Sequence, residues 1–189
     1  MERKDRYGTM TDQLWANFRD KLNNNNYAKL QGYPLTDTEF NQVKRAIEVR
    51  TPYEAAKLLA AENGIGKVEG ERDDAKLGTV TLELFWKVDV AGGKSSYEVV
   101  RQAVRPRLAG TQNVDPDRRF DVTLLINGLP LIQLELKKAT VELNQAFNQI
   151  EKYAQEGKYT GIYSLLQMFV IMTPDKYGVF CECRTGSFQ

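Results

Sequence analysis

Two acidic residues and a lysine near the middle of the chain could together carry out hydrolytic chemistry. Asp121 is followed by Glu135 after thirteen intervening residues, and Lys137 comes two positions later, in the pattern D-x13-E-x-K. Two nearby carboxylates repel each other unless a proton or cation lies between them, and hard oxygen ligands select Mg²⁺ or Mn²⁺. Such an ion polarises a phosphoryl oxygen, and a lysine beside it stabilises developing charge. The three residues predict a magnesium site suited to phosphodiester hydrolysis.

Histidine does not occur in the 189-residue sequence, and this narrows the possible mechanisms. Ser-His-Asp hydrolysis, histidine-ligated metal nucleases, zinc proteases and phosphohistidine chemistry all need an imidazole. The two cysteines, Cys181 and Cys183, are too few for a zinc site that normally takes four Cys or His ligands. Carboxylate and lysine chemistry with a hard metal ion remains.

A predicted β-hairpin would bring the acidic residues together. Asn127-Gly128 stands between two apolar runs, and this dipeptide is typical of a two-residue hairpin turn. The numbers of opposite residues around such a turn sum to about 255. The numbers of Asp121 and Glu135 sum to 256, so the hairpin is expected to place the two carboxylates nearly opposite each other.

Alternation along the second apolar run divides its side chains between two faces of a strand. One face carries Ile132, Leu134 and Leu136, and the other carries Leu131, Gln133, Glu135 and Lys137. The second face becomes charged halfway along. A plain structural alternative is that Glu135 and Lys137 are an exposed strand end and that Asp121 caps a loop, since the pattern is short in a chain that is 27% charged.

The first third of the chain has apolar residues at helical spacing. Helices are expected within residues 12–26, 36–49 and 51–63. Thr36 or Asp37 and Thr51 are good N-terminal caps, and Gly64 is a plausible helix stop. The asparagine run Asn23–Asn26 is expected to form a loop.

From Lys67 the hydrophobic period changes toward two, which indicates strands. A strand is expected within 77–90, a helix over 139–159, and further strands at 167–173 and 177–184, while 97–104 fits either a short helix or a strand. This order predicts an α/β or α+β sandwich in a single domain over residues 1–189, with a helical part at 1–65 and a core at 66–189.

The bulk composition limits the partners of the chain. A net charge of +1 gives no global basic field, so any affinity for nucleic acid must come from a local patch. No stretch has the apolar length needed to cross a bilayer, and the charged N-terminus does not fit a signal peptide, which predicts a cytoplasmic protein. The segment AGGKSS lacks the first glycine of a phosphate-binding P-loop, because Val88 stands there, and is expected to connect strands.

The D-x13-E-x-K pattern on a hairpin resembles the active-site signature of the PD-(D/E)xK nuclease superfamily. The flanking sequence more narrowly resembles the N-terminal nuclease domain of type I restriction enzyme R subunits, through PLTDTEF, TPYEAAKLL, YEVV, RRFDVTLLINGLPLIQLELKKA, QAFNQIEKY and LLQMFV. Phe120 departs from the superfamily pattern, which has proline before the aspartate. The resemblance implies a restriction-endonuclease-like core, with a mixed central sheet flanked by helices and an N-terminal helical region, and a DNA endonuclease activity.

The resemblance also implies roles for individual residues. Asp121 and Glu135 match the metal-binding carboxylates, the Leu136 backbone carbonyl is expected as a further ligand, and Lys137 matches the catalytic lysine. The implied cofactor is Mg²⁺, which Mn²⁺ can replace.

Gln149 and Tyr153 match the QxxxY motif of the family. Residues four apart on a helix project from the same face, so both could reach DNA or the catalytic hairpin. The alternative is that this helix face packs on the sheet. Arg118, Arg119 and Lys138 flank the acidic residues and would put positive charge beside the scissile phosphate, where contacts position DNA without reading its sequence.

The implied partners are double-stranded DNA and the modification (methyltransferase) and specificity subunits of a type I restriction complex. ATP would serve only the helicase-type motor domains, whose motifs do not fit this sequence. Two rival interpretations remain open: a non-catalytic docking or DNA-binding domain on a nuclease fold, and a RecB-like repair exonuclease, a group that shares the QxxxY motif.

Overall fold

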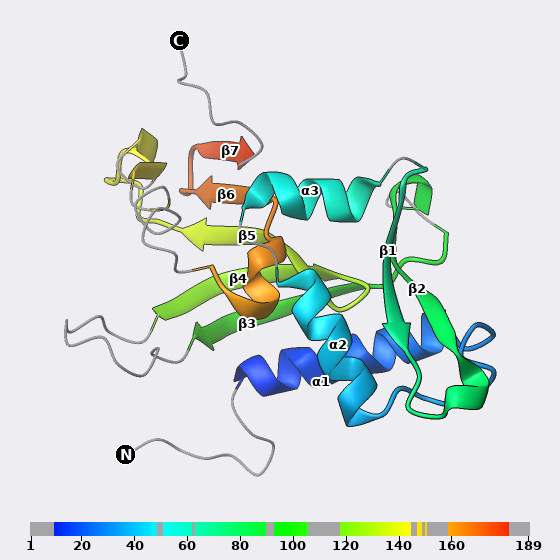
Figure 1. Ribbon diagram of the computed structural model, residues 1–189. Coiled ribbons are helices and arrows are strands. Elements are labelled where there is room, and N and C mark those ends of the chain that lie inside the picture. The colour runs from blue at the N-terminus through cyan, green and yellow to red at the C-terminus, as the bar shows by residue number, and fades with distance from the viewer. Residues whose placement is uncertain are drawn as a thin grey trace, which may run out of the picture.

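The computed structural model contains two separate β-sheets and a group of N-terminal helices (Figure 1). It describes residues 10–48, 51–61, 63–89, 93–105, 118–144, 147–148, 150 and 159–181. The helices are α1 (Met10–Asn25), α2 (Asp37–Ile47) and α3 (Pro52–Ala60), with short 3₁₀ helices η1 (Ala75–Leu77), η2 (Lys87–Asp89) and η3 (Gly161–Leu165). The strands are β1 (Ile65–Glu71), β2 (Thr79–Trp86), β3 (Tyr97–Arg105), β4 (Arg118–Ile126), β5 (Leu129–Leu136), β6 (Met168–Met172) and β7 (Tyr177–Cys181). The expected mixture of helices and strands is confirmed.

The helix starts predicted from capping residues are confirmed. Thr36 caps α2 and Thr51 caps α3, and each helix has a capping box in which the glutamate at its third position bonds back to the cap backbone. The predicted stop at Gly64 is wrong, because α3 ends at Ala60 with Ala61 as its C-cap. Gly64, at a φ of 68°, instead lies directly before β1.

The asparagine run is not a loop: α1 continues through Asn25, and Asn26 is buried. The Asn26 side chain donates to the Leu22 carbonyl at the end of α1 and to the Glu83 carbonyl in β2, both at 2.9 Å. Its oxygen accepts from the Glu83 backbone N–H at 2.8 Å. One side chain thus satisfies backbone groups of α1 and β2 together, and this contact distant in sequence extends the helix.

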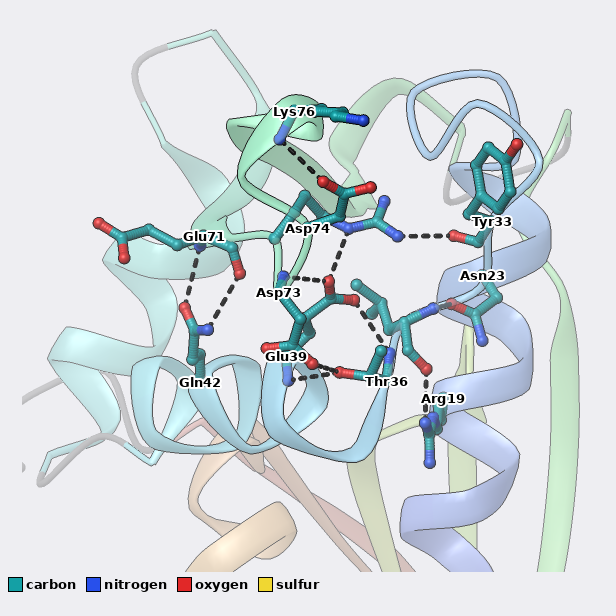
Figure 2. A network of polar contacts seen from close by, with 12 residues as sticks. Arg19, Asn23, Tyr33, Thr36, Glu39, Gln42, Glu71, Asp73, Asp74 and Lys76 are labelled. Atoms are coloured by element: carbon teal, nitrogen blue, oxygen red, sulfur yellow. Dashed lines mark hydrogen bonds and ion pairs between the residues drawn. The ribbon is translucent and has the colours of Figure 1, made fainter.

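The β1–β2 hairpin forms its own two-stranded sheet beside α1 and α2 (Figure 1). A buried polar network fixes it to the start of α2 (Figure 2). The Arg72 guanidinium, just past β1, donates to Glu39 Oε1 at 2.9 Å and to the Tyr33 carbonyl at 3.0 Å. The backbone N–H groups of Asp73 and Thr36 also donate to the Glu39 carboxylate, and the Thr36 hydroxyl bonds to Asp73.

The second sheet has the strand order β3-β4-β5-β6-β7, and its pairs are antiparallel except for the parallel pair β5–β6. The mixed central sheet is therefore confirmed, and residues 97–105 are a strand rather than a helix. The crossover from β5 to β6 is described in part, with helical residues at 143–144, 147–148 and 150 and then η3.

The predicted hairpin at Asn127-Gly128 joins β4 and β5 as expected. Both residues have positive φ, 54° and 78°, as a tight turn of the hairpin type requires. A Cβ on Gly128 would meet the Phe18 Cα of α1 at 2.8 Å, so the turn packs closely against that helix. The helix α1 thereby fixes the end of the hairpin opposite to the acidic residues.

Candidate active site

The β4–β5 ladder aligns Asp121 with Glu135. Val122 pairs with Leu134 and Thr123 with Gln133, so the register continued by one residue sets Asp121 opposite Glu135. An irregularity between Leu124 and Leu125 shifts the register by one residue next to the turn. Directly opposite residues lie on the same face of a sheet, so the two carboxylates share a face.

Asp121 is held by the backbone of the neighbouring strand. Its Oδ2 accepts a hydrogen bond of 2.8 Å from the Leu136 backbone N–H, just beyond Glu135. The backbone of β5 is fixed in turn from its other side, because the Lys137 N–H donates to the Met172 carbonyl of β6 at 2.8 Å. Three adjacent strands thus determine where the two carboxylates lie.

Lys137 extends to Glu135, with a distance of 3.4 Å between Lys137 Nζ and Glu135 Oε2. The two side chains are only 26% and 18% exposed. Burial raises the pKa of Glu135 above its ordinary value, the Lys137 charge lowers it, and the negative charge of Asp121 raises it again, with a net rise. Burial of the Glu135 carboxyl therefore outweighs the effect of the neighbouring Lys137 charge on its pKa.

A buried polar pair lies behind Glu135 on the same face of the sheet. The Thr123 hydroxyl donates to Gln133 Oε1 at 2.9 Å, and both side chains are almost fully buried. The Gln133 amide then donates to Glu135 Oε1 and to the Leu134 carbonyl, at 3.4 and 3.3 Å. The sequence pattern did not point to Thr123. The sequence could have indicated its role, because Thr123 is a polar residue directly across the predicted hairpin from Gln133.

The structure brings Asp121, Glu135, Leu136 and Lys137 together at one end of the β4–β5 hairpin. Lys138 follows them as an exposed residue. The other expected site residues cannot be placed in the same way. Arg118 and Arg119 belong to β4 by their backbone, but their side chains lie outside the described part, and Gln149 and Tyr153 lie outside the described residues altogether.

The residues present at this site fit a hard divalent cation. Within the described parts of the chain, no group of three or more Cys, Asp or Glu side chains gathers in a way that could hold a metal ion. Mg²⁺, however, is usually bound by one or two carboxylates and keeps several waters. Asp121 and Glu135 supply two carboxylates on one face of the hairpin, and a cation between them would offset their mutual repulsion.

A family comparison decides what kind of chain presents this site. Residues 1–187 match the family model described as type I restriction enzyme R protein N terminus. The chain belongs to this family. The match covers nearly the whole sequence, including the described hairpin and the helical N-terminal part.

Relatives of this R protein N terminus agree with the family match. The chain is 36% identical over 159 residues to the type I restriction enzyme SauCOLORF180P endonuclease subunit of Staphylococcus aureus (strain COL), which covers 84% of the chain and 15% of that protein. It is 35% identical over 173 residues to the type I restriction enzyme SsaAORF53P endonuclease subunit of Staphylococcus saprophyticus. That alignment covers 87% of the chain and 16% of the relative. A 55-residue stretch is 51% identical to the EcoprrI endonuclease subunit of Escherichia coli, covering 28% of the chain and 18% of that protein. The chain therefore spans about a sixth of the length of the longer relatives it matches.

Among the helices that the structure describes, none is long and apolar enough to span a membrane.

Proposed function

We propose that this chain is the metal-dependent DNA-cleaving domain of a type I restriction R subunit, with a restriction-endonuclease-like PD-(D/E)xK core. The observation that carries the proposal is the hairpin end where Asp121 and Glu135 share a face and Lys137 contacts Glu135. The names of the relatives, all endonuclease subunits of type I restriction enzymes, support the activity, and the proposed substrate is double-stranded DNA.

Each residue of the hairpin end has a distinct role in this proposal. Asp121 and Glu135 bind Mg²⁺, which Mn²⁺ can replace, and the Leu136 carbonyl is the expected third protein ligand. Bound there, the ion supplies a polarised phosphoryl oxygen and a more acidic water. The Lys137 ammonium orients the attacking water and stabilises negative charge that develops on the phosphate.

The covered position of the site suits this chemistry. Glu135 and Lys137 are mostly shielded from solvent, and charge interactions are stronger where water is excluded. Lys138 is exposed beside the pair and is proposed, with Arg118 and Arg119, to contact DNA phosphates. Gln149 and Tyr153 stay proposed members of the site, as their QxxxY match implies.

The whole complex extends the proposal beyond this chain. The modification and specificity subunits would select the DNA, and ATP would be used only by motor domains elsewhere in the R subunit. A docking domain on a nuclease fold would not need two repelling carboxylates beside a lysine. Their presence on one hairpin end favours the catalytic interpretation over docking.

The test replaces Asp121 or Lys137 by alanine in the full-length R subunit and assembles the complete restriction complex. We expect both variants to bind DNA, hydrolyse ATP and translocate as before, because these steps use other domains. DNA cleavage should fall by at least about 100-fold, since the loss removes the charge stabilisation at the reacting phosphate.

Lys176→Ala is the matched control, because Lys176 is an exposed lysine in the turn between β6 and β7. This variant should cleave DNA at the wild-type rate. Wild-type cleavage by either Asp121→Ala or Lys137→Ala would overturn the proposed function.

A further inference from the structure

The five-stranded sheet has a second face, opposite to the carboxylates, on which apolar side chains run across all the strands. The pairing register defines one row on this face from Val99 through Leu124, Ile132 and Met168 to Cys181. The next row on the same face runs through Arg101, Val122, Leu134, Val170 and Val179. We call these two rows the outer face.

The outer face is exposed on the edge strands β3 and β7, and its residues on β4, β5 and β6 are half-buried. Val99 is 62% exposed and Val179 is 49% exposed, although both are strongly apolar. Contacts from the helices run to the other face: Asn17 of α1 donates to Glu98, next to Val99, and Phe147 stacks on Phe180 at 4.3 Å. Large contiguous apolar patches on a soluble protein mark surfaces that bind another structure.

The strand composition also indicates that the outer face is built to be covered. β6 reads MFVIM, with no polar residue on either side, although one side already lies in the core through Phe169 and Ile171. A strand exposed on one face normally alternates apolar with polar residues, whereas parallel strands buried on both faces read as continuous apolar runs. β6 pairs in parallel with β5 and follows the second pattern.

We propose that, in the full-length R subunit, the outer face is covered by a part of the same polypeptide that lies beyond this chain. The chain spans only 15% of its Staphylococcus aureus relative, so most of such a subunit is available as a covering layer. The occupant is an apolar face of that remaining polypeptide, which completes a third layer over the sheet. The apolar side chains of the outer face would thereby fix the sheet to the rest of the subunit.

The chemistry of the outer face disfavours other occupants. DNA binding needs several cationic side chains against phosphates, and Arg101 is the one charged residue in the two rows. A second copy of the chain could bury the face, but a segment joined covalently to it has a far higher effective concentration. The attached polypeptide is therefore favoured.

The experiment measures the reactivity of single cysteines in the full-length R subunit. Val99→Cys and Val179→Cys place a thiol on the outer face, and Tyr53→Cys on α3 is the control, since Tyr53 is 69% exposed. N-ethylmaleimide labelling at each position is followed by peptide mass spectrometry. We expect labelling at 99 and 179 to be at least roughly tenfold slower than at 53, because only opening of the interface exposes them.

Equal labelling at the three positions would overturn the proposal, because the face would then be open in the intact subunit. Protection that disappears on dilution would overturn it in favour of a second copy. Protection that appears only after DNA or the other subunits are added would overturn it in favour of those partners.

A charged variant gives a second measurement. Val179→Lys should lower the melting temperature of the full-length subunit, because a charge would be buried in the interface, while Tyr53→Lys should leave it unchanged. Equal melting temperatures for the two variants would contradict the proposed covering layer.

Discussion

Glu135 is the residue on which the proposed chemistry depends most, and its surroundings come from three directions. Lys137 contacts it at 3.4 Å, Asp121 lies across the hairpin, and the Gln133 amide lies 3.4 Å from its other oxygen. The amide is itself oriented by Thr123. A carboxylate held by hydrogen bonds presents its oxygens to a cation in a fixed direction, which is the usual role of groups behind a metal ligand.

Replacing the buried pair behind Glu135 should weaken metal binding without unfolding the chain. In Thr123→Val with Gln133→Met, both polar partners become apolar groups of similar shape, and such paired changes are nearly neutral for stability. We expect the Mn²⁺ affinity to fall by roughly tenfold, because Glu135 loses its orienting donor. A Mn²⁺ titration followed by electron paramagnetic resonance measures this affinity, and urea unfolding measures the stability.

The control for the buried pair is Gln42→Met on α2. Gln42 bonds the backbone of the exposed Glu71 in β1, far from the β4–β5 hairpin. Its Mn²⁺ affinity should equal that of the wild type. An unchanged Mn²⁺ affinity in the double variant would show that Gln133 does not orient Glu135.

At the residue scale, the sequence predicted the two faces of β5 but not which face would be covered. Alternation assigned Gln133 and Glu135 to one side and Ile132 and Leu134 to the other, and the burial of β5 follows that division. The more apolar side is the less buried one, contrary to what residue type alone suggests. The positions of the helices decide which face of β5 is buried, and contacts distant in sequence set those positions.

Among the elements, the β4–β5 hairpin depends on its close contact with α1. Gly128→Ala should destabilise the chain in two ways, through its φ of 78° and through a Cβ that would lie 2.8 Å from the Phe18 backbone. The backbone conformation alone costs about 1–2 kcal/mol, and the overlap should add at least about 1 kcal/mol. Urea unfolding of the Gly128→Ala variant and the wild type measures the total loss of stability.

Gly78→Ala separates the two contributions. Gly78 also has a positive φ, 62°, but a Cβ there meets nothing within 4 Å. This variant should show only the cost of the backbone conformation. Equal losses of stability at positions 78 and 128 would mean that the turn does not pack against α1 as described.

The capping box of α2 should make stability depend on pH. Burial raises the pKa of Glu39, but hydrogen bonds from Asp73, Thr36 and Arg72 together lower it by more than burial raises it. The folded pKa therefore lies below the ordinary 4.5. Its contribution to stability is therefore full above about pH 4.5 and is lost as the pH falls through the lower folded value. Glu39→Gln should cost about 3 kcal/mol at pH 7, because Arg72 stays buried without its partner.

The matched control is Glu54→Gln, which alters the same position of the capping box of α3 at an exposed site. Its cost at pH 7 should be below about 1 kcal/mol. The difference between wild type and Glu39→Gln should shrink as the pH falls below 4.5. A difference that stays constant between pH 7 and pH 3 would contradict the role given to the Glu39 charge.

At the element scale, local signals were sufficient where a side chain bonds its own helix or turn. Thr36, Thr51 and Asn127-Gly128 belong to this kind, and the structure confirms each. The asparagine run was misjudged because Asn26 bonds Glu83, 57 positions away, and no local pattern contains that contact.

For the whole molecule, the proposed place of the chain within a longer R subunit would account for features that a self-contained domain would not need. Its Staphylococcus relatives are several times longer, one sheet face is apolar and partly exposed, and its net charge is close to zero. Periodicity and turn chemistry predicted the acidic hairpin, and the family resemblance implied the mixed sheet. It could not predict the separate β1–β2 sheet, because strand patterns do not state which strands become neighbours.

The most direct test of the proposed nuclease site is a crystal structure of the protein soaked with Mn²⁺, with anomalous scattering recorded near the manganese absorption edge. We expect an anomalous peak between the carboxylates of Asp121 and Glu135, with the Leu136 carbonyl in its coordination shell. The Asp121→Ala variant should show no peak at that position. An empty site at saturating Mn²⁺ in the wild type, with Asp121 still bonded to the Leu136 N–H, would contradict the proposed metal site.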